Sequence, residues 1–158
     1  MIKIITGDIG SGKTSKIESI YTDVGGDGFI TRKIFYNNKN IGQRIYRLTS
    51  GKNLIFALKT DFLHRVWDEE CRFFNYSFSK TGLDFARKII TESMEYRFNP
   101  IFIDEIGPLE IYLESGLFYI FKKLISAPLN DLYISVRTDC LNDFIIKFEI
   151  SDYSVTVL

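Results

Sequence analysis

The stretch GDIGSGKT, residues 7–14, decides how the rest of this 158-residue sequence is interpreted. It fits the pattern G-x-x-x-x-G-K-[ST], in which a glycine-rich turn leads into a helix. The apolar run at 2–5 predicts a buried strand before the turn, and residues 13–24 repeat apolar side chains at helical spacing after it. Strand, turn and helix therefore follow in the order that the pattern requires, and the stretch predicts a phosphate-binding loop.

Each part of this loop has a physical task. Glycine allows backbone conformations that other residues avoid, so the chain can approach a phosphate closely and point successive N–H groups at it. Lys13 supplies a positive charge for the outer phosphates, and the Thr14 hydroxyl is a candidate ligand of Mg²⁺. The residues expected to contact a nucleotide are Gly7, Asp8, Ile9, Gly10, Ser11, Gly12, Lys13, Thr14 and Ser15.

A pair of acidic residues follows a second buried strand, which the apolar run at 101–103 predicts. Asp104 and Glu105 come directly after this run, and the carboxyl ends of parallel strands form the ligand-binding edge of an open α/β sheet. Asp104 is therefore the expected carboxylate of a metal site that it shares with Thr14. Glu105 is expected to reach past the metal and to activate a water molecule that attacks the γ-phosphate.

Other polar residues are candidates for contact with a nucleotide. Arg137 follows the predicted strand at 132–136 at the same edge of the sheet, where an arginine could stabilise charge on the transferring phosphate. Arg32 and Lys33 would reach the nucleotide only if their hairpin folds over the site. Glu110 fits the first turn of a helix, where the helix dipole favours a carboxylate. Four aromatic residues alternate along a predicted strand and are interpreted as core, namely Phe73, Phe74, Tyr76 and Phe78.

The sequence as a whole predicts an α/β fold in one domain that spans residues 1–158. Turn residues divide 28–59 into three β-rich runs, which indicates an antiparallel meander inserted into the fold. Outside the meander, predicted strands and helices alternate, which favours a mostly parallel sheet with helices on both faces. Further strands are expected at 101–103, 132–137 and 153–157.

The sequence also predicts the secondary structure of four other segments. A capping pattern predicts a helix that starts at Thr81. Apolar spacing predicts one helix through residues 113–124, closed by Pro128, and another through 141–148. Residues 60–80 are the least regular part, with a short helix expected around Leu63, Val66 and Trp67 and a strand at 72–78.

Composition argues against several classes of protein. Lys and Arg total 20 and Asp and Glu total 20, so no overall positive field recruits nucleic acid or an anionic membrane. No apolar run reaches the roughly 18 residues of a membrane span. The single histidine, His64, argues against a histidine zinc site or Ser-His catalysis. Cys71 and Cys140 lack metal-site spacing and predict reduced, buried thiols in a cytoplasmic protein.

Three blocks of this sequence resemble the THEP1-type nucleoside-triphosphatases. They are GDIGSGKT at 7–14, GFIT at 28–31 and IDEIGPLE at 103–110. The resemblance covers nearly the whole chain, and the third block is its most specific element. It implies a RecA-like P-loop NTPase that hydrolyses nucleoside 5′-triphosphates, such as ATP and GTP, with Mg²⁺ and modest base selectivity. By this similarity Lys13 and Thr14 act in the phosphate loop, Asp104 at the metal and Glu105 on the water.

Two other functions stay open from the residues alone. A nucleotide or small-molecule kinase would use the same loop, but it needs an acceptor pocket and an arginine-rich lid that excludes water. Residues 126–140 contain only Arg137 as an arginine, whereas the meander could wall an acceptor pocket. The third function is a nucleotide-dependent binding module whose hydrolysis is slow without a protein partner. Glu105 beside Asp104 favours hydrolysis, because it gives water a base without an acceptor substrate.

Overall fold

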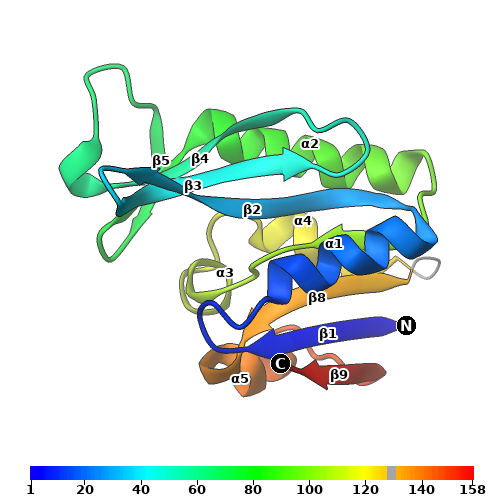
Figure 1. The fold of residues 1–158 in the computed structure, drawn as a ribbon. Coiled ribbons are helices and arrows are strands. Elements are labelled where there is room, and N and C mark those ends of the chain that lie inside the picture. The colour runs from blue at the N-terminus through cyan, green and yellow to red at the C-terminus, as the bar shows by residue number, and fades with distance from the viewer. Residues whose placement is uncertain (128–130) are drawn as a thin grey trace.

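The computed structural model describes residues 1–127 and 131–158 of the chain (Figure 1). The strands are β1 (Ile2–Gly7), β2 (Asp27–Tyr36), β3 (Lys39–Arg47), β4 (Asn53–Lys59), β5 (Glu69–Phe73), β6 (Tyr76–Ser79), β7 (Ile101–Ile103), β8 (Leu132–Arg137) and β9 (Tyr153–Val157). The helices are α1 (Lys13–Val24), α2 (Lys80–Glu95), α3 (Pro108–Leu113), α4 (Phe118–Ile125) and α5 (Leu141–Lys147). The strands form a sheet in the order β5-β6-β4-β3-β2-β7-β8-β1-β9.

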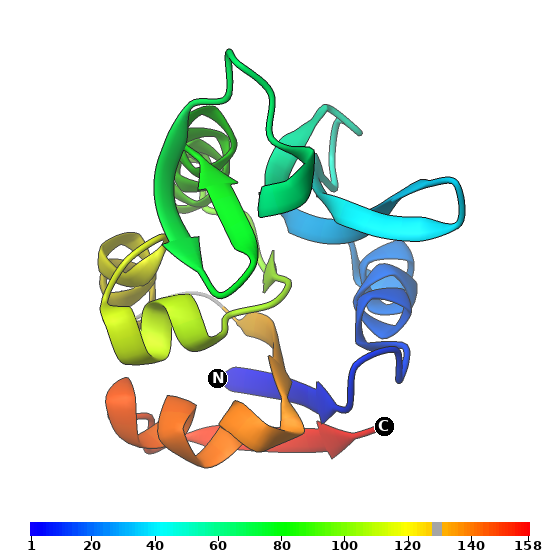
Figure 2. The same ribbon diagram turned by 90° about the vertical axis from the view of Figure 1, so that its left-hand side faces the viewer.

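The strand before the phosphate loop lies in the parallel part of this sheet. β1 pairs in parallel with β8 and β9, and β7 pairs in parallel with β2 and β8. Figure 2 shows α1 on one side of the sheet and α2, α4 and α5 on the other, which divides the core into two apolar clusters. Because both faces are covered, the three residues of β7 are completely buried. The strands predicted at 101–103, 132–137 and 153–157 and the helices predicted at 13–24 and 141–148 are present.

The meander predicted for residues 28–59 is also present. β2, β3 and β4 pair antiparallel, and the β5–β6 hairpin extends the sheet beyond β4. β2 joins the two halves, because its first residues pair in parallel with β7 while most of its length pairs antiparallel with β3. The meander is therefore continuous with the parallel sheet and does not form a separate layer.

The predictions for residues 60–80 are wrong in two respects. No helix forms at 63–67, where the described backbone is irregular after a 3₁₀ turn. The strand expected at 72–78 is instead the β5–β6 hairpin, which turns at Phe74 with a φ of 48°. A phenylalanine in this left-handed conformation is uncommon, and the turn carries no Asn-Gly or Asp-Gly signal. Asn75 alone marks the turn, and a single asparagine within an aromatic run is a weak signal.

Helix α2 begins earlier than predicted, because Ser79 caps it instead of Thr81. The Ser79 hydroxyl oxygen accepts the backbone N–H of Gly82 at 2.8 Å, which satisfies a free donor of the first helical turn. Thr81 lies inside the helix, and its backbone N–H donates to the Asp68 carboxylate at 2.9 Å. Both residue types favour the cap position, so the sequence pattern alone does not separate them.

The single helix predicted through residues 113–124 is two helices in the structure. Between α3 and α4, Glu114 and Gly116 adopt left-handed φ values of 49° and 62°. A Cβ atom on Gly116 would lie 2.6 Å from Glu110 Oε1, so the close approach of the two segments requires glycine there. Pro128, the predicted end of this helix, lies outside the described residues.

The burial of the two cysteines and the length of the helices can also be compared with the sequence predictions. Cys140 is buried, as predicted, but Cys71 is only half-buried, and both are free thiols. In the part of the chain that the structure describes, no helix has both the length and the apolar character needed to cross a membrane.

A buried ion pair ties the meander to the helical layer. Asp27, at the start of β2, is fully buried, and its Oδ2 accepts the Nε–H of Arg47 at 2.9 Å. The Arg47 guanidinium also pairs with Glu92 of α2, and the Thr49 hydroxyl donates to Asp27 Oδ1 at 2.9 Å. A buried carboxylate is costly without such partners, so the pair fixes how the end of β3 packs on α2.

We expect Arg47→Met to lower the free energy of unfolding by about 3 kcal/mol, because the Asp27 charge loses its cation while it stays buried. Urea denaturation at pH 7 measures the change. Arg44→Met is the matched control, since Arg44 lies on the same strand and donates to Asn53 at the protein surface. It should change the stability by less than about 0.5 kcal/mol. Equal effects of the two substitutions would contradict the importance of the buried pair.

Candidate active site

The phosphate loop connects β1 to the first turn of α1, as predicted. Gly10 and Gly12 adopt left-handed φ values of 85° and 97°, which residues with a side chain rarely tolerate. Lys13 is buried, and its Nζ donates to the carbonyl oxygens of Gly7 and Asp8, each at 2.8 Å. These bonds hold the ammonium group over the loop, at the positive end of the α1 dipole.

A cavity of about 440 Å³, the phosphate cleft, lies between this loop and the meander. Of the residues expected to contact a nucleotide, the cleft is lined by Ile9, Gly10, Gly12, Lys13, Thr14 and Ser15. Thr31, Lys33, Gln43 and Glu105 line its other side. Gly7, Asp8 and Ser11 do not line the cleft. The carbonyls of Gly7 and Asp8 hold the Lys13 ammonium, and the Ser11 backbone N–H donates to the Asp8 carbonyl at 3.1 Å.

Asp104 is the most highly connected side chain of the site. It is buried, and its Oδ2 accepts the Thr14 hydroxyl at 2.8 Å and the Thr31 backbone N–H at 3.0 Å. Its Oδ1 accepts the Ser135 hydroxyl. Burial raises the pKa of Asp104, whereas these hydrogen bonds favour the charged form and act in the opposite direction. The carboxylate therefore joins α1, β2 and β8 at one point.

Glu105 lies next to Asp104 in a left-handed backbone conformation, with a φ of 59°. Such a conformation costs about 1–3 kcal/mol in a residue other than glycine. The Glu105 backbone N–H donates to the Ser135 hydroxyl at 2.8 Å, which holds the strained turn. Its carboxylate Oε2 accepts Gln43 Nε2 at 2.8 Å and the Thr31 hydroxyl at 3.3 Å.

The environment of Glu105 suits a general base. Glu105 is an exposed residue of the cleft wall, and its carboxylate lies beside that of the buried Asp104 and within hydrogen-bond distance of Gln43 and Thr31. Desolvation, followed by the negative charge of Asp104, raises the pKa of Glu105 above its ordinary value. A carboxylate with a raised pKa accepts a proton more readily, which favours removal of a proton from water.

Three residues of this network were not predicted as site residues. Ser135 interrupts the apolar run of β8, and that polar position in a buried strand is a signal the sequence offers. Thr31 belongs to the GFIT block, but the block alone does not show that it donates to Asp104. Gln43 gives no local signal, because it approaches Glu105 from β3 across the cleft.

The remaining candidates are Arg137, Arg32 and Glu110, and each has hydrogen-bond or ion-pair partners in the structure. Arg137 ends β8 and does not line the phosphate cleft, but it lines an adjoining cavity together with Glu105. Its Nη2 donates to Asp139 at 3.1 Å. Arg32 forms an ion pair with Glu18 of α1. Glu110 is buried in the first turn of α3, accepting the backbone N–H of Gly107 at 3.2 Å and that of Leu117 at 3.1 Å.

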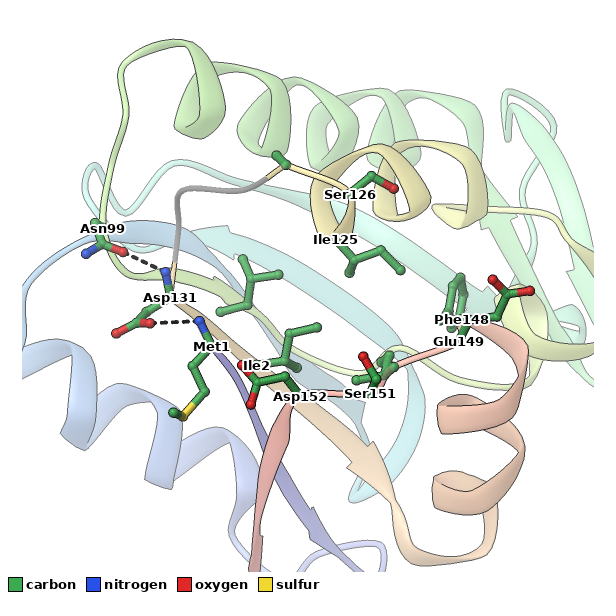
Figure 3. A pocket seen from close by; sticks show the side chains of 13 residues that line it. Met1, Ile2, Asn99, Ile125, Ser126, Asp131, Phe148, Glu149, Ser151 and Asp152 are labelled. Carbon is green, nitrogen blue, oxygen red and sulfur yellow. Dashed lines mark hydrogen bonds and ion pairs between the residues drawn. The ribbon is translucent and has the colours of Figure 1, made fainter.

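A different cavity, of about 580 Å³, lies at the opposite end of the parallel strands (Figure 3). The amino group of Met1 pairs with Asp131 Oδ1 at 3.1 Å, and Asn99 Oδ1 accepts the Asp131 backbone N–H at 2.7 Å. This end holds the amino termini of β1 and β8, whereas ligands of open α/β sheets bind at the carboxyl ends. The phosphate loop and the acidic pair identify the other edge as the candidate site.

A family model described as NTPase matches residues 3–133, which include the phosphate loop and the acidic pair. The chain belongs to this NTPase family. It also resembles the crystal structure of THEP1 from the hyperthermophile Aquifex aeolicus, with a TM-score of 0.78 and 23% identity over 100% of this chain and 90% of the other. The solution structure of a human cancer-related nucleoside triphosphatase gives a TM-score of 0.69 and 21% identity, over 98% and 87% of the two chains. Among curated proteins, none matches the sequence.

These comparisons confirm the THEP1-type resemblance and the α/β P-loop fold. The NTPase is a hydrolase that acts on nucleoside triphosphates, as the paired motifs predicted. The hydrogen bonds around Asp104 then indicate which residues of the chain are candidates for roles in this reaction.

We expect Ser135→Ala to lower kcat of the NTPase by about 10- to 100-fold, the usual effect of removing a group that orients a ligand or catalytic side chain. The substitution leaves the Glu105 N–H and Asp104 Oδ1 without their shared partner. Thr6→Val is the control, because the buried Thr6 hydroxyl on neighbouring β1 has no hydrogen-bond partner within the described residues. Steady-state phosphate release measures both variants, and equal kcat values would exclude a positioning role for Ser135.

Proposed function

We propose that this NTPase cleaves the bond between the β- and γ-phosphates, with Mg²⁺ as cofactor, water as nucleophile and Glu105 as base. The observation that carries the proposal is the contact between the phosphate loop and the acidic pair. The Thr14 hydroxyl donates to Asp104 Oδ2 at 2.8 Å, and Glu105 follows Asp104 directly at the wall of the phosphate cleft. The groups that we assign to metal binding and to water activation are thus neighbours at the phosphate cleft.

The donor set of the site fits Mg²⁺. A hydroxyl and a carboxylate are the oxygen ligands that Mg²⁺ prefers, and it usually combines one or two protein ligands with substrate phosphates and water. Within the described ranges, no group of three or more His, Cys, Asp or Glu side chains could hold a metal by itself. Thr14 and Asp104 would therefore hold the ion together with the nucleotide. When bound, Mg²⁺ neutralises charge on the β- and γ-phosphates.

The residues of the chain then have distinct tasks. Lys13 and the loop N–H groups bind the β- and γ-phosphates and stabilise the charge that develops on them. Glu105 takes a proton from water, whose oxygen bonds to the γ-phosphorus while the bond to the bridging oxygen breaks. The products are a nucleoside diphosphate and phosphate. We also assign to Arg137, at the end of β8, the task of adding positive charge beside the γ-phosphate.

Broad base tolerance follows from the same assignments. The assigned residues bind phosphates and metal, which all nucleoside triphosphates share. We therefore propose that ATP, GTP, CTP and UTP are all substrates.

We also propose a cytoplasmic location for this single domain, with which its two free thiols are consistent.

We expect Glu105→Gln to reduce phosphate release by about 10²- to 10⁴-fold while nucleotide affinity changes little, because only proton removal is lost. Lys13→Ala should weaken both binding and turnover. Glu114→Gln is the matched control, since Glu114 is also a glutamate with a left-handed φ, of 49°, but pairs with Lys147 outside the site. Phosphate release from all four nucleotides and titration calorimetry measure the effects. Full activity of Glu105→Gln would exclude Glu105 as the base.

Removal of Mg²⁺ should abolish phosphate release, and added Mg²⁺ should restore it, because the cluster of phosphates and carboxylates needs a cation to offset its charge. Asp104→Asn should raise the Mg²⁺ concentration that gives half-maximal activity. Activity assays in EDTA and over a Mg²⁺ titration test both statements. Equal turnover with and without the ion would contradict the assignment of Thr14 and Asp104.

A further inference from the structure

The aromatic side chains of the β5–β6 hairpin follow the sequence prediction only in part, because Phe78 packs against the hydrophobic core whereas Phe74 lies outside it. Phe74 is 85% exposed, and Phe73, Tyr76 and Phe78 are half-buried. Of these four residues, Phe73, Tyr76 and Phe78 line a cavity of about 380 Å³, which we call the aromatic cavity. Its volume lies within the range of about 300–1,000 Å³ that is usual for sites of small organic ligands.

The aromatic cavity lies between the hairpin and α3, which are neighbours in Figure 2. Phe56 of β4 forms part of its wall, with its ring edge-to-face against Phe78 at a centroid distance of 5.6 Å. Leu109 and Leu117 close the cavity on the side of α3 and α4. Aromatic and aliphatic walls of this kind favour packing against the faces of a flat aromatic ring.

The aromatic cavity and the phosphate cleft meet at Glu105, the proposed general base. Both are lined by Ile9, Lys33, Gln43 and Glu105. Glu105 therefore borders the phosphates on one side and the aromatic cavity on the other. A ligand in the aromatic cavity would place its nearest atoms against the carboxylate that is assigned to water.

Polar groups of the aromatic cavity favour a neutral ligand that carries hydroxyl groups. Asn40 and Gln43 present amides on the meander side, and Asn40 Nδ2 donates to the Tyr76 hydroxyl at 3.1 Å. The basic side chains on its wall are Lys33 and Arg137, and the acidic ones are Asp104, Glu105 and the buried Glu110, whose pKa burial raises to about 7. A phosphorylated ligand would add negative charge beside these carboxylates, whereas a neutral alcohol would not.

We propose that the aromatic cavity binds a nucleoside and presents its 5′-hydroxyl to Glu105 in place of water. A nucleoside combines a planar ring for the aromatic walls with a hydroxylated sugar for the amides and Glu105. This proposal rests on the proposed function, because it uses the same base and the same phosphate cleft. The enzyme would then transfer the γ-phosphate when the cavity is filled and release it to water when the cavity is empty.

The transfer step balances without a further reactant. Glu105 takes the proton of the 5′-hydroxyl, the hydroxyl oxygen bonds to the γ-phosphorus, and the bond from that phosphorus to the β,γ-bridging oxygen breaks. The products are a nucleoside 5′-monophosphate and a nucleoside diphosphate, and the proton passes from Glu105 to solvent. The residues that bind the phosphates keep the tasks that they have in hydrolysis.

Radiolabelled [γ-³²P]ATP with Mg²⁺, incubated with each of the four ribonucleosides at millimolar concentration, tests the proposal. Labelled nucleoside 5′-monophosphate should appear, and free phosphate should decrease by the same molar amount. 5′-Deoxyadenosine, which keeps the ring but lacks the accepting hydroxyl, should lower phosphate release without forming a labelled product. Glu105→Gln should lose both products.

A pair of neighbouring variants links the transfer to the aromatic cavity. Phe73→Asp places a charge on the apolar wall and should lower the ratio of nucleoside monophosphate to free phosphate by about tenfold or more. Phe74→Asp is the control, because Phe74 is exposed and does not line the cavity. This ratio should be unchanged in that variant.

The outcomes separate the two proposals. Phosphate release that no nucleoside alters, with no labelled monophosphate, overturns the acceptor site and leaves hydrolysis standing. Inhibition by nucleosides without a labelled product also overturns the transfer. Absence of phosphate release from ATP alone, in every condition, overturns the proposed hydrolysis itself.

Discussion

The buried Asp104 carboxylate is the constraint on which the rest of the site depends. A carboxylate without water must find hydrogen-bond donors or a cation, since an unpaired buried charge is very costly. Asp104 obtains its donors from Thr14, Thr31 and Ser135, which belong to α1, β2 and β8. These elements can meet at one point only because β7 lies between β2 and β8 at the carboxyl edge of the sheet. The phosphate loop is thereby fixed against the acidic pair before any nucleotide binds.

The same network holds a strained residue in place. The left-handed backbone of Glu105 turns its side chain into the cleft, and the Ser135 hydroxyl that binds Asp104 also accepts the Glu105 N–H at 2.8 Å. Strain of this kind persists where the surrounding structure determines the conformation, and it is concentrated at functional sites. One serine thus positions both acidic residues, and Gln43 and Thr31 hold the Glu105 carboxylate from the meander. The meander contributes a wall of the site as well as strands of the sheet.

Local sequence was sufficient to predict the phosphate loop, the acidic pair and most of the elements that carry them. The loop motif places Gly12, Lys13 and Thr14 side by side in sequence, and the acidic pair comes directly after a fully apolar strand. Ser135, Thr31 and Gln43 could not be assigned in this way, because their contacts depend on strand order and on how the meander folds over the cleft. The hairpin at Phe74 and the break at Glu114 were missed for another reason. Both need left-handed backbone at residues that seldom adopt it, and tertiary packing supplies that cost.

A crystal structure of the enzyme with Mg²⁺ and a β,γ-imido nucleoside triphosphate is the most direct test of the roles assigned to Thr14, Asp104 and Glu105. We expect the ion to bind at the Thr14 hydroxyl beside Asp104, so that Asp104 loses its hydrogen bond from Thr14. We also expect an ordered water that contacts Glu105 and faces the γ-phosphate. An ion bound away from Asp104, or a Glu105 carboxylate turned away from the γ-phosphate, would contradict the account.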